Sequence, residues 1–429
     1  MIKIFATAII VVLYSHSTLL AQADSTTVYK KRVLETTEID FLTSYYTQDG
    51  QNAAVTGGIG TEELTDATAT FIVSIPLNDD DVLSIDAGIS AYSSASSSNI
   101  NPFDGDSDPY VASSGASSGD TWTNLTVGYS HSSDDRNKLW GVHGSISAEY
   151  DYLSIGFGGN VSRLFNQQNT EVSLSANVYL DTWSIIYPTE LRGSGNFRQS
   201  SITGNRNYDP IFVPLTGKNR NSYALGLTIS QVLSRKLQGS LTLDVVQQDG
   251  LLSTPFQRVY FEDIEDSFVD GFHLAEDIER LPDTRMKVAL GGRLHYYINE
   301  FLSIRSFARY YQDDWGIGSL TASVELPIKL GMKWTIYPSY RYYNQGAADY
   351  FKPYNQHLST DPFYTSDYDL SKYNANQYGF GVRYTDIFTS FHIGKFRLKS
   401  VDLKYYYYDR NTPFSSSIIT GGLNFVVGK

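Results

Sequence analysis

The chain has 429 residues, a formal net charge of −13 at pH 7 and no cysteine. The absence of cysteine excludes disulfide bonds, thiolate catalysis, cysteine-ligated zinc and a lipid-modified N-terminal cysteine. The seven histidines form no close pair, so no strong metal motif remains, and the excess of acidic residues argues against nucleic acid as a partner. The length allows two or three soluble domains or one large barrel.

The first 23 residues are predicted to be a secretory signal peptide. Lys3 precedes an apolar run over residues 4–13, and Ala21-Gln22-Ala23 fits a small-x-small cleavage site. A buried N-terminal helix is the alternative. Residues 24–35 are expected to form a short periplasmic segment, and no later apolar run approaches the roughly 20 residues of a transmembrane helix. The mature chain is therefore expected to be exported and to lack transmembrane helices.

The rest of the chain repeats its hydrophobic residues with a period of two. In residues 332–343, Trp334 and Ile336 share one face, whereas Thr335 and Arg341 share the other. Segments of about ten residues with one apolar face and one polar or glycine-rich face are typical of transmembrane barrel strands. A soluble sandwich would instead have a face of large aliphatic residues that forms a dense core. Here the polar face is too polar for a core, and aromatic residues gather toward the segment ends.

The segments follow one another along residues 36–429 and predict an all-β fold: a transmembrane antiparallel up-and-down β-barrel of about 16 strands, within about 14–18. The connections test this count, because such barrels alternate short periplasmic turns with longer outer loops. Counted from the inside, every long connection is odd-numbered, at residues 93–120, 188–221, 249–284 and 344–376. The predicted strands are residues 38–47, 67–77, 82–92, 121–131, 139–150, 152–165, 171–183, 222–232, 237–248, 285–298, 301–311, 317–328, 332–343, 377–389, 396–408 and 416–427.

Four adjacent tyrosines occupy residues 405–408. On an ascending strand, Tyr405 and Tyr407 would face lipid near the outer head groups, where an apolar ring with a hydrated hydroxyl is favoured. Tyr406 and Tyr408 would then face the mouth of the barrel. An aggregation-prone edge strand of a soluble protein is the alternative. The predicted aromatic girdle consists of Trp334, Tyr340, Tyr342, Tyr405 and Tyr407.

Charged residues on the inward face fall into two groups, an acidic wall from early strands and a basic wall from later strands. Inside a water-filled barrel such walls would order water, disfavour apolar solutes and favour anions. The hypothesis is a constricted, weakly anion-preferring pore, and the alternative is a salt-bridged interior that braces a plugged barrel. The acidic wall is Asp40, Asp86, Glu149, Asp181 and Asp244; the basic wall is Lys287, Arg293, Arg305, Arg309, Lys333, Arg341, Arg383 and Lys404, with His295 beside it and Glu325 and Asp402 as local partners.

Two acidic loops are candidates for ligand binding. Asp104, Asp106 and Asp108 alternate along NPFDGDSDPY, a spacing that can wrap a hard cation such as Ca²⁺, and a solvated turn is the alternative. Residues 261–280 are strongly acidic and carry apolar residues near helical spacing, at Phe272, Leu274, Ile278 and, just beyond, Leu281. This pattern predicts a short helix that caps or plugs the barrel, or a loop that binds cations, with a solvated acidic loop as the alternative. No other cofactor is expected.

The stretch YYTQDGQNAAVTGGIGTEEL (residues 45–64), the following IPLNDDDVLSIDAGISAYSSASSSNI and the serine-rich SSGASSGD resemble a family of exported Bacteroidota proteins that is described as a domain of unknown function. The likeness covers nearly the whole mature chain. Its most specific parts are the TQDG…AVTGG element and the Ser-Ala-Ser-Ser repeats. The resemblance implies an outer-membrane barrel, often encoded near a thioredoxin-like protein, a small lipoprotein and a flavin transferase. It implies no catalytic residue.

The sequence predicts no enzyme. His143, Ser145 and Glu149 share a strand face, but at ~3.4 Å per residue they are too dispersed for a catalytic triad. We predict instead an outer-membrane β-barrel of a Gram-negative bacterium, surrounded by lipid, that acts as a porin-like channel for small polar or anionic solutes. One alternative is a non-conducting barrel that serves as a scaffold for redox or metal-handling partners, such as a small lipoprotein or a thioredoxin-like protein. A soluble β-rich binding protein is the third hypothesis.

Overall fold

The computed structural model describes residues 32–93, 120–192 and 199–427. The predicted signal peptide and the candidate calcium loop with Asp104, Asp106 and Asp108 lie outside these residues. Within the described part, no helix has the length and the apolar character needed to cross a membrane. The dominant structure there is one large antiparallel sheet.

This sheet is a closed barrel of 16 antiparallel strands, as predicted. Strands adjacent in the barrel are consecutive in the chain, and the barrel closes where the last strand, β23 (Phe414–Val427), pairs with the first, β1 (Glu38–Gly50). One strand is interrupted at Leu326 and Pro327, because proline has no N–H to donate to the ladder, and its two parts are β17 and β18. The other strands are β2 (Leu64–Pro76), β3 (Asp81–Tyr92), β4 (Asp120–Ser132), β5 (Lys138–Ala148), β6 (Tyr152–Phe165), β7 (Thr170–Trp183), β9 (Asn219–Ser234), β10 (Leu237–Gly250), β15 (Thr284–Tyr297), β16 (Ser303–Asp313), β17 (Gly318–Glu325), β18 (Ile328–Leu330), β19 (Trp334–Gln345), β20 (Tyr373–Thr385) and β22 (Phe396–Arg410).

The outward wall of the barrel is apolar and uncovered. Phe41 and Phe71 stand opposite each other on it, with ring centroids 4.6 Å apart, and Trp334 exposes 49% of its surface. The four clusters of buried hydrophobic side chains found in the described residues all lie in the connections between barrel strands, and none lies on this wall. A ring of exposed apolar side chains around a closed sheet is what contact with hydrocarbon requires.

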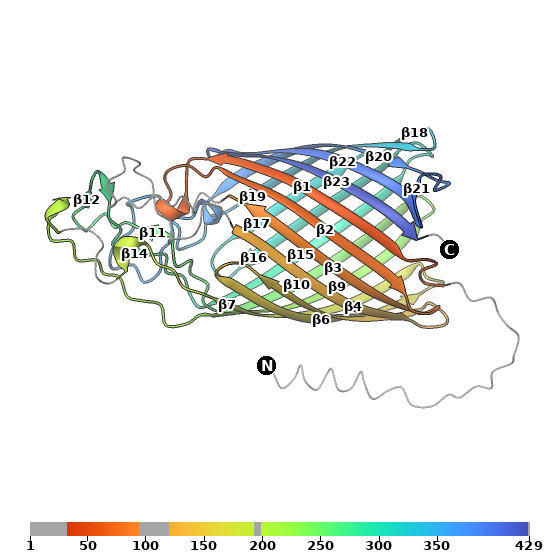
Figure 1. Ribbon diagram of the computed structural model, residues 1–429, viewed down its shortest axis with the longest axis horizontal. Coiled ribbons are helices and arrows are strands. Elements are labelled where there is room, and N and C mark those ends of the chain that lie inside the picture. The colour runs from red at the N-terminus through yellow and green to blue at the C-terminus, as the bar shows by residue number, and fades with distance from the viewer. Residues whose placement is uncertain (1–31, 94–119, 193–198, 428–429) are drawn as a thin grey trace, which may run out of the picture. The chain divides into compact units, whose positions relative to one another are not determined.

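The long connections of the described residues all lie at one end of the barrel, on the left in Figure 1, which also carries short ones such as residues 149–151 and 411–413. The alternation predicted from the sequence is therefore confirmed. β1 begins and β23 ends at the opposite end of the barrel. The short turns include residues 77–80, 133–137, 166–169 and 235–236, and the long connections include residues 51–63, 184–218, 251–283 and 346–372.

The long connections pack together into what we call the outer cap, which comprises residues 51–63, 184–192, 199–218, 251–283, 314–317 and 346–372. The four hydrophobic clusters form its core, so the most buried apolar residues of the described chain belong to loops rather than to the barrel. Five short strands contribute to the cap: β8 (Ile202–Gly204), β11 (Arg258–Val259), β12 (Ser267–Val269), β13 (Phe272–His273) and β14 (Asp277–Ile278).

The acidic loop at residues 261–280 forms no helix, so the helical prediction was wrong. Its apolar residues do not make one stripe but enter separate clusters, because Leu274 packs with Ile202 whereas Ile278 packs with Leu191. Both Leu274 and Ile278 are fully buried, so the alternative of a solvated loop was wrong as well. Partners from another connection determine the local structure of this loop, and the spacing of its own residues could not reveal them.

Candidate functional site in the barrel lumen

A cavity of about 280 Å³ lies against the wall formed by the later strands. Ten of its thirteen lining residues form two rows across the sheet, because residues paired between neighbouring strands lie side by side; the other three, Ser306, Val324 and Tyr340, lie between the rows and alternate to the other face. A Cβ at Gly379 would lie 2.6 Å from the ring of Tyr406, so glycine at this position lets the ring lie close to the wall. The first row contains Arg293, Phe307, Ser323, Arg341 and Gln377, and the second contains His295, Arg305, Glu325, Ser339 and Tyr406.

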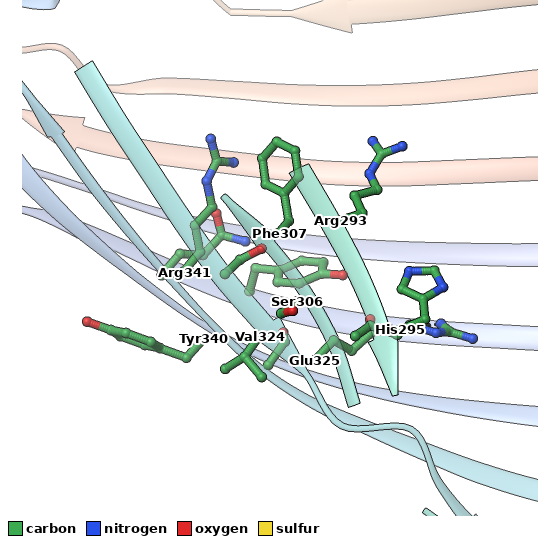
Figure 2. Close-up of a pocket in the computed structure, with 13 residues that line it drawn as sticks. Arg293, His295, Ser306, Phe307, Val324, Glu325, Tyr340 and Arg341 are labelled. Atoms are coloured by element: carbon green, nitrogen blue, oxygen red, sulfur yellow. Dashed lines mark hydrogen bonds and ion pairs between the residues drawn. The ribbon is translucent and has the colours of Figure 1, made fainter. Parts of the chain in front are cut away.

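The two faces of this wall are chemically distinct. Figure 2 shows Arg293, Phe307 and Arg341 rising from one face of the sheet, whereas Val324 and Tyr340 leave it on the other. This is the alternation expected of strands with lipid on one side and water on the other.

The ring of Tyr337 on β19 identifies which face is internal. The charged groups of Arg305 on β16, Arg383 on β20 and Lys404 on β22 lie 5.9, 5.8 and 5.5 Å from its centroid. β16 and β22 are not neighbours of β19 in the sheet. Their side chains therefore reach this ring across the concave face, inside the barrel. Three residues of the predicted basic wall are brought together here by cation–π contacts.

Two carboxylates neutralise part of the basic wall. Arg305 Nη1 donates to Glu325 Oε1 at 2.8 Å, and Arg383 Nε donates to Asp402 Oδ1 at 2.5 Å. Glu325 and Asp402 are the two acids that were predicted from the sequence to be local partners of the basic wall. Both pairs keep partial exposure, so each contributes little to stability and its main effect is on the charge of the lumen.

Two arginines of the cavity have no acidic partner among the residues the structure describes. Arg293 lies over the ring of Phe307, 5.5 Å from its centroid, and Arg341 forms no ion pair with any described residue. Arg309, further along the inner face of β16, is also without an acidic partner in the described chain, but it does not line the cavity. Three guanidinium groups against the single carboxylate of Glu325 give the cavity a positive charge, which attracts anions.

The other two lysines of the predicted basic wall lie away from this cavity. Lys287 is near the outer end of β15, in the electrostatic neighbourhood of Arg285 and Asp313. Lys333 lies in the turn before β19, and its Nζ is 5.8 Å from the centroid of Tyr384. These two residues therefore belong to the two ends of the barrel rather than to the cavity.

The predicted acidic wall is spread over the early strands, on a different arc of the barrel. Asp40 Oδ1 accepts a hydrogen bond from Asn424 Nδ2 at 2.5 Å, and Asp181 accepts one from the hydroxyl of Tyr152. Asp40 and Asp86 lie in one row across the sheet, separated by Ile72. Asp86 lies on β3, Asp244 on β10 and Glu149 just after β5.

A different acidic cluster lies at the outer rim. Asp120, Glu149 and Asp151 offer carboxylate oxygens within 4.8 Å of one another. Burial raises the pKa of Glu149 and of Asp151, and Trp183 Nε1 donates to Asp151 Oδ2 at 3.1 Å. Carboxylates are the ligands of hard cations, and they also gather at surfaces without an ion. The sequence did not predict this cluster, because β4 and β5 separate Asp120 from the other two residues.

The girdle residues occupy the outward wall. Trp334, Tyr340, Tyr405 and Tyr407 are all well exposed, and the hydroxyls of Tyr405 and Ser417 are 3.2 Å apart. Tyr342 is half-buried, and its hydroxyl donates to Asn374 Oδ1. Trp334 lies beside a short turn, whereas the tyrosines lie toward the outer end.

The outer cap is fastened to side chains at the rim of the barrel. Gln345 Nε2 donates to the carbonyl of Ser371 at 2.6 Å, and Arg410 Nη1 donates to Asp369 Oδ1 at 2.8 Å. On another part of the rim, Phe256 packs edge-on against the tryptophan that ends β7, with centroids 6.2 Å apart. The cap is therefore held to the barrel at more than one point of its outer rim.

Sequence reasoning missed the buried charges inside the cap. Burial raises the pKa of Glu279 to about 7, although its carboxylate accepts hydrogen bonds from Thr254 N at 2.7 Å and Thr365 Oγ1 at 2.6 Å. Burial also raises the pKa of Asp367, to about 6. In the sequence these acids look like any others of an acidic loop, and no spacing signals that they are buried.

One protein family matches nearly the whole chain. The sequence profile of a family described as "Protein of unknown function (DUF3570)" matches residues 6–417. The chain belongs to this family. The expectation of a family of unknown function with an outer-membrane barrel fold is thereby confirmed. No curated protein matches the DUF3570 sequence.

The solved structures similar to the DUF3570 barrel include the following three. One is titled "Bacterial polysaccharide outer membrane secretin", with a TM-score of 0.45, 10% identity and coverage of 91% of this chain and 98% of that one. A second is a deletion mutant of the TodX monoaromatic hydrocarbon channel, with a TM-score of 0.40, 9% identity and coverage of 92% and 91%. A third is a Pseudomonas aeruginosa FadL homologue, with a TM-score of 0.39, 10% identity and coverage of 92% and 90%. At these values we draw no conclusion about activity from the likeness.

Proposed function

We propose that the DUF3570 barrel is a channel for small polar solutes that prefers anions. The observation that carries this proposal is the positive cavity in the lumen, where Arg293 and Arg341 have no acidic partner in the described chain. Barrels of 16 to 18 strands leave room for an aqueous channel, and arginine-lined constrictions favour anions. A buried structural arginine would instead be paired, since an unpaired charge is tolerated only where water reaches it.

The cellular setting belongs to the same proposal. The mature barrel would lie in the outer membrane of a Gram-negative bacterium of the Bacteroidota type, with outer-membrane lipid around its apolar wall. Export would use the N-terminal signal peptide, with cleavage after Ala23, and the chain would have no catalytic role. The short turns would face the periplasm, because that is the usual orientation of such barrels.

The test is ion flow through single purified barrels in a planar bilayer. The expected result is discrete conductance steps and, under a salt gradient, a reversal potential of the sign that anions produce. The Arg293→Glu, Arg341→Glu double variant should move the reversal potential toward cation selectivity, whereas Arg309→Glu, outside the cavity, should move it less. Conductance at the level of bilayer leak would reject the channel.

The second candidate is a non-conducting barrel that acts as a scaffold for a small lipoprotein or a thioredoxin-like partner, in redox or metal handling. The observation in its favour is the outer cap, which has its own hydrophobic core and is fastened to the rim through Gln345 and Arg410. Stoichiometric co-purification of such a partner, together with absent flux in liposomes, would favour the scaffold over the channel.

A further inference from the structure

We infer that the lumen cavity binds a small organic dianion, such as a short aliphatic dicarboxylate, held between Arg293 and Arg341. The inference rests on the proposed channel function and names its substrate class. It follows from the charge, the spacing and the lining of this one cavity.

The cavity has two positive charges that no described carboxylate compensates. Of its three arginines, Arg305 is paired with Glu325, Nη1 to Oε1, at 2.8 Å. Arg293 and Arg341 remain, and neither has a carboxylate partner among the residues that the structure describes. One ligand with two carboxylates would neutralise both guanidinium groups, whereas a monoanion would leave one of them uncompensated.

The spacing of the two arginines favours a ligand with a charge at each end. Arg293 is opposite Phe307, Phe307 is opposite Ser323, and Ser323 is opposite Arg341. Three strand spacings therefore separate the backbones of the two arginines, which is roughly 14 Å. Both are long side chains that rise into the lumen on either side of Phe307 (Figure 2). At this separation a compact anion with a single charged centre is expected to pair fully with only one of them, whereas a short chain with a carboxylate at each end can reach both.

The lining between the arginines favours an organic ligand over an inorganic one. Phe307 offers an apolar ring for a hydrocarbon chain, and the small side chains of Ser323 and Ser339 leave the space above the wall open. Their hydroxyls and the amide of Gln377 can hydrogen-bond to carboxylate oxygens that the arginines leave free. Inorganic phosphate could pair with an arginine but has no apolar part to pack against the ring of Phe307.

The direct test is equilibrium binding to the purified full-length barrel in detergent, measured by calorimetry with succinate, butyrate and inorganic phosphate. Succinate should bind at least about tenfold more tightly than either of the others, since each of them lacks one charge-assisted pair that succinate makes. This comparison needs no variant. Equal binding of butyrate or phosphate would overturn the inference.

Variants then test the two arginines. Arg293→Gln and Arg341→Gln should each weaken succinate binding about tenfold or more, and Arg341→Lys, which keeps the charge but loses the planar fork, should weaken it less. The matched control is Arg309→Gln, on the same wall but outside the cavity, which should leave binding within about twofold of the parent. If Arg309→Gln weakened succinate binding as much as Arg293→Gln and Arg341→Gln do, the general positive charge of the lumen would explain the binding, and the inference would be overturned. Heat-modifiable migration on a detergent gel verifies that each variant is folded.

Binding and conduction together separate this inference from the proposed function. Conductance without selective succinate binding would leave the channel intact and overturn the dianion site. Succinate binding without conductance would support the site and reject the channel. If both proposals hold, succinate should also interrupt the single-channel current at lower concentrations than butyrate does.

Discussion

Arg258 donates from Nε to Glu190 Oε1 at 2.6 Å, and neither side chain has any exposed surface. Arg258 also donates from Nη1 to the carbonyl of Val55 at 3.0 Å. One guanidinium group therefore joins three separate connections of the outer cap. Because a buried charge without its partner is costly, this pair links the folding of each connection to that of the others.

Replacing Glu190 by glutamine is expected to loosen the outer cap without opening the barrel. The uncompensated charge of Arg258 should destabilise the cap by about 3–5 kcal/mol. Hydrogen exchange should accelerate in residues 255–280, whereas heat-modifiable migration of the barrel stays unchanged. Glu262→Gln is the control, since Glu262 is an exposed acid of the same cap. Equal rates of hydrogen exchange in Glu190→Gln and Glu262→Gln would show that the pair of Arg258 and Glu190 does not stabilise the cap.

The cap is expected to be more stable in mild acid than in mild base. Burial raises the pKa of Glu279 to about 7 and that of Asp367 to about 6, above the ordinary values of 4.5 and 3.8. The folded cap then binds protons more tightly than the unfolded loops do, so its stability falls as the pH rises through this interval. Protease cleavage within residues 254–283 should be slower at about pH 5 than at about pH 8.

Glu279→Gln supplies the control for this pH dependence, because the amide stays neutral at every pH. The dependence should shrink in this variant, with the part due to Asp367 remaining. Cleavage that is faster in acid than in base would show that the sign is wrong.

A second comparison separates the cap core from the barrel wall. Ile278→Ala should cost the cap about 2–5 kcal/mol, because Ile278 is fully buried in a hydrophobic cluster. Leu241→Ala on the outward wall should cost less, about 1–2 kcal/mol, since Leu241 faces lipid or detergent and its truncation loses transfer free energy but leaves no cavity in packed protein. Denaturant titration measures the stability of each variant, with proteolysis of the cap as the readout for Ile278→Ala and heat-modifiable migration of the barrel as the readout for Leu241→Ala. A larger loss at Leu241 would show that the wall is packed against another part of the protein.

The contact between Arg410 and Asp369 is expected to affect conduction more than stability. Asp369 is mostly exposed, so solvent screens the pair and Asp369→Asn should change stability by no more than about 1 kcal/mol. Freed from the rim, the connection at residues 346–372 should move more, and single-channel records should show more frequent transitions between conductance levels. Asp409→Asn, next to Arg410 on β22, is the matched control. Identical records from both variants would argue that this contact does not position the cap.

Most of the barrel could be predicted from the sequence. The alternation around Leu403 and Tyr405 indicated which residues face outward, and the number of such segments predicted the strand count, which the parity of the long connections supported. Both signals are local, because every second side chain of a membrane strand faces the same solvent and every turn joins neighbouring strands. The placement of Glu325 beside Arg305 was predictable for the same reason, since they stand opposite each other on adjacent strands.

Only the tertiary structure decided the cap and the charge of the cavity. Leu274 and Ile278 have a spacing that favours a helix, but their burial depends on Ile202 and Leu191, which come from another connection. The positive charge of the cavity likewise depends on which arginines find no acid across the closed barrel. Contacts of this kind join residues far apart in the chain, so no periodic pattern of the sequence predicts them. The period of two in the sequence determined the barrel strands, whereas the free energy of burying particular side chains against distant partners determined the cap and the charge of the cavity.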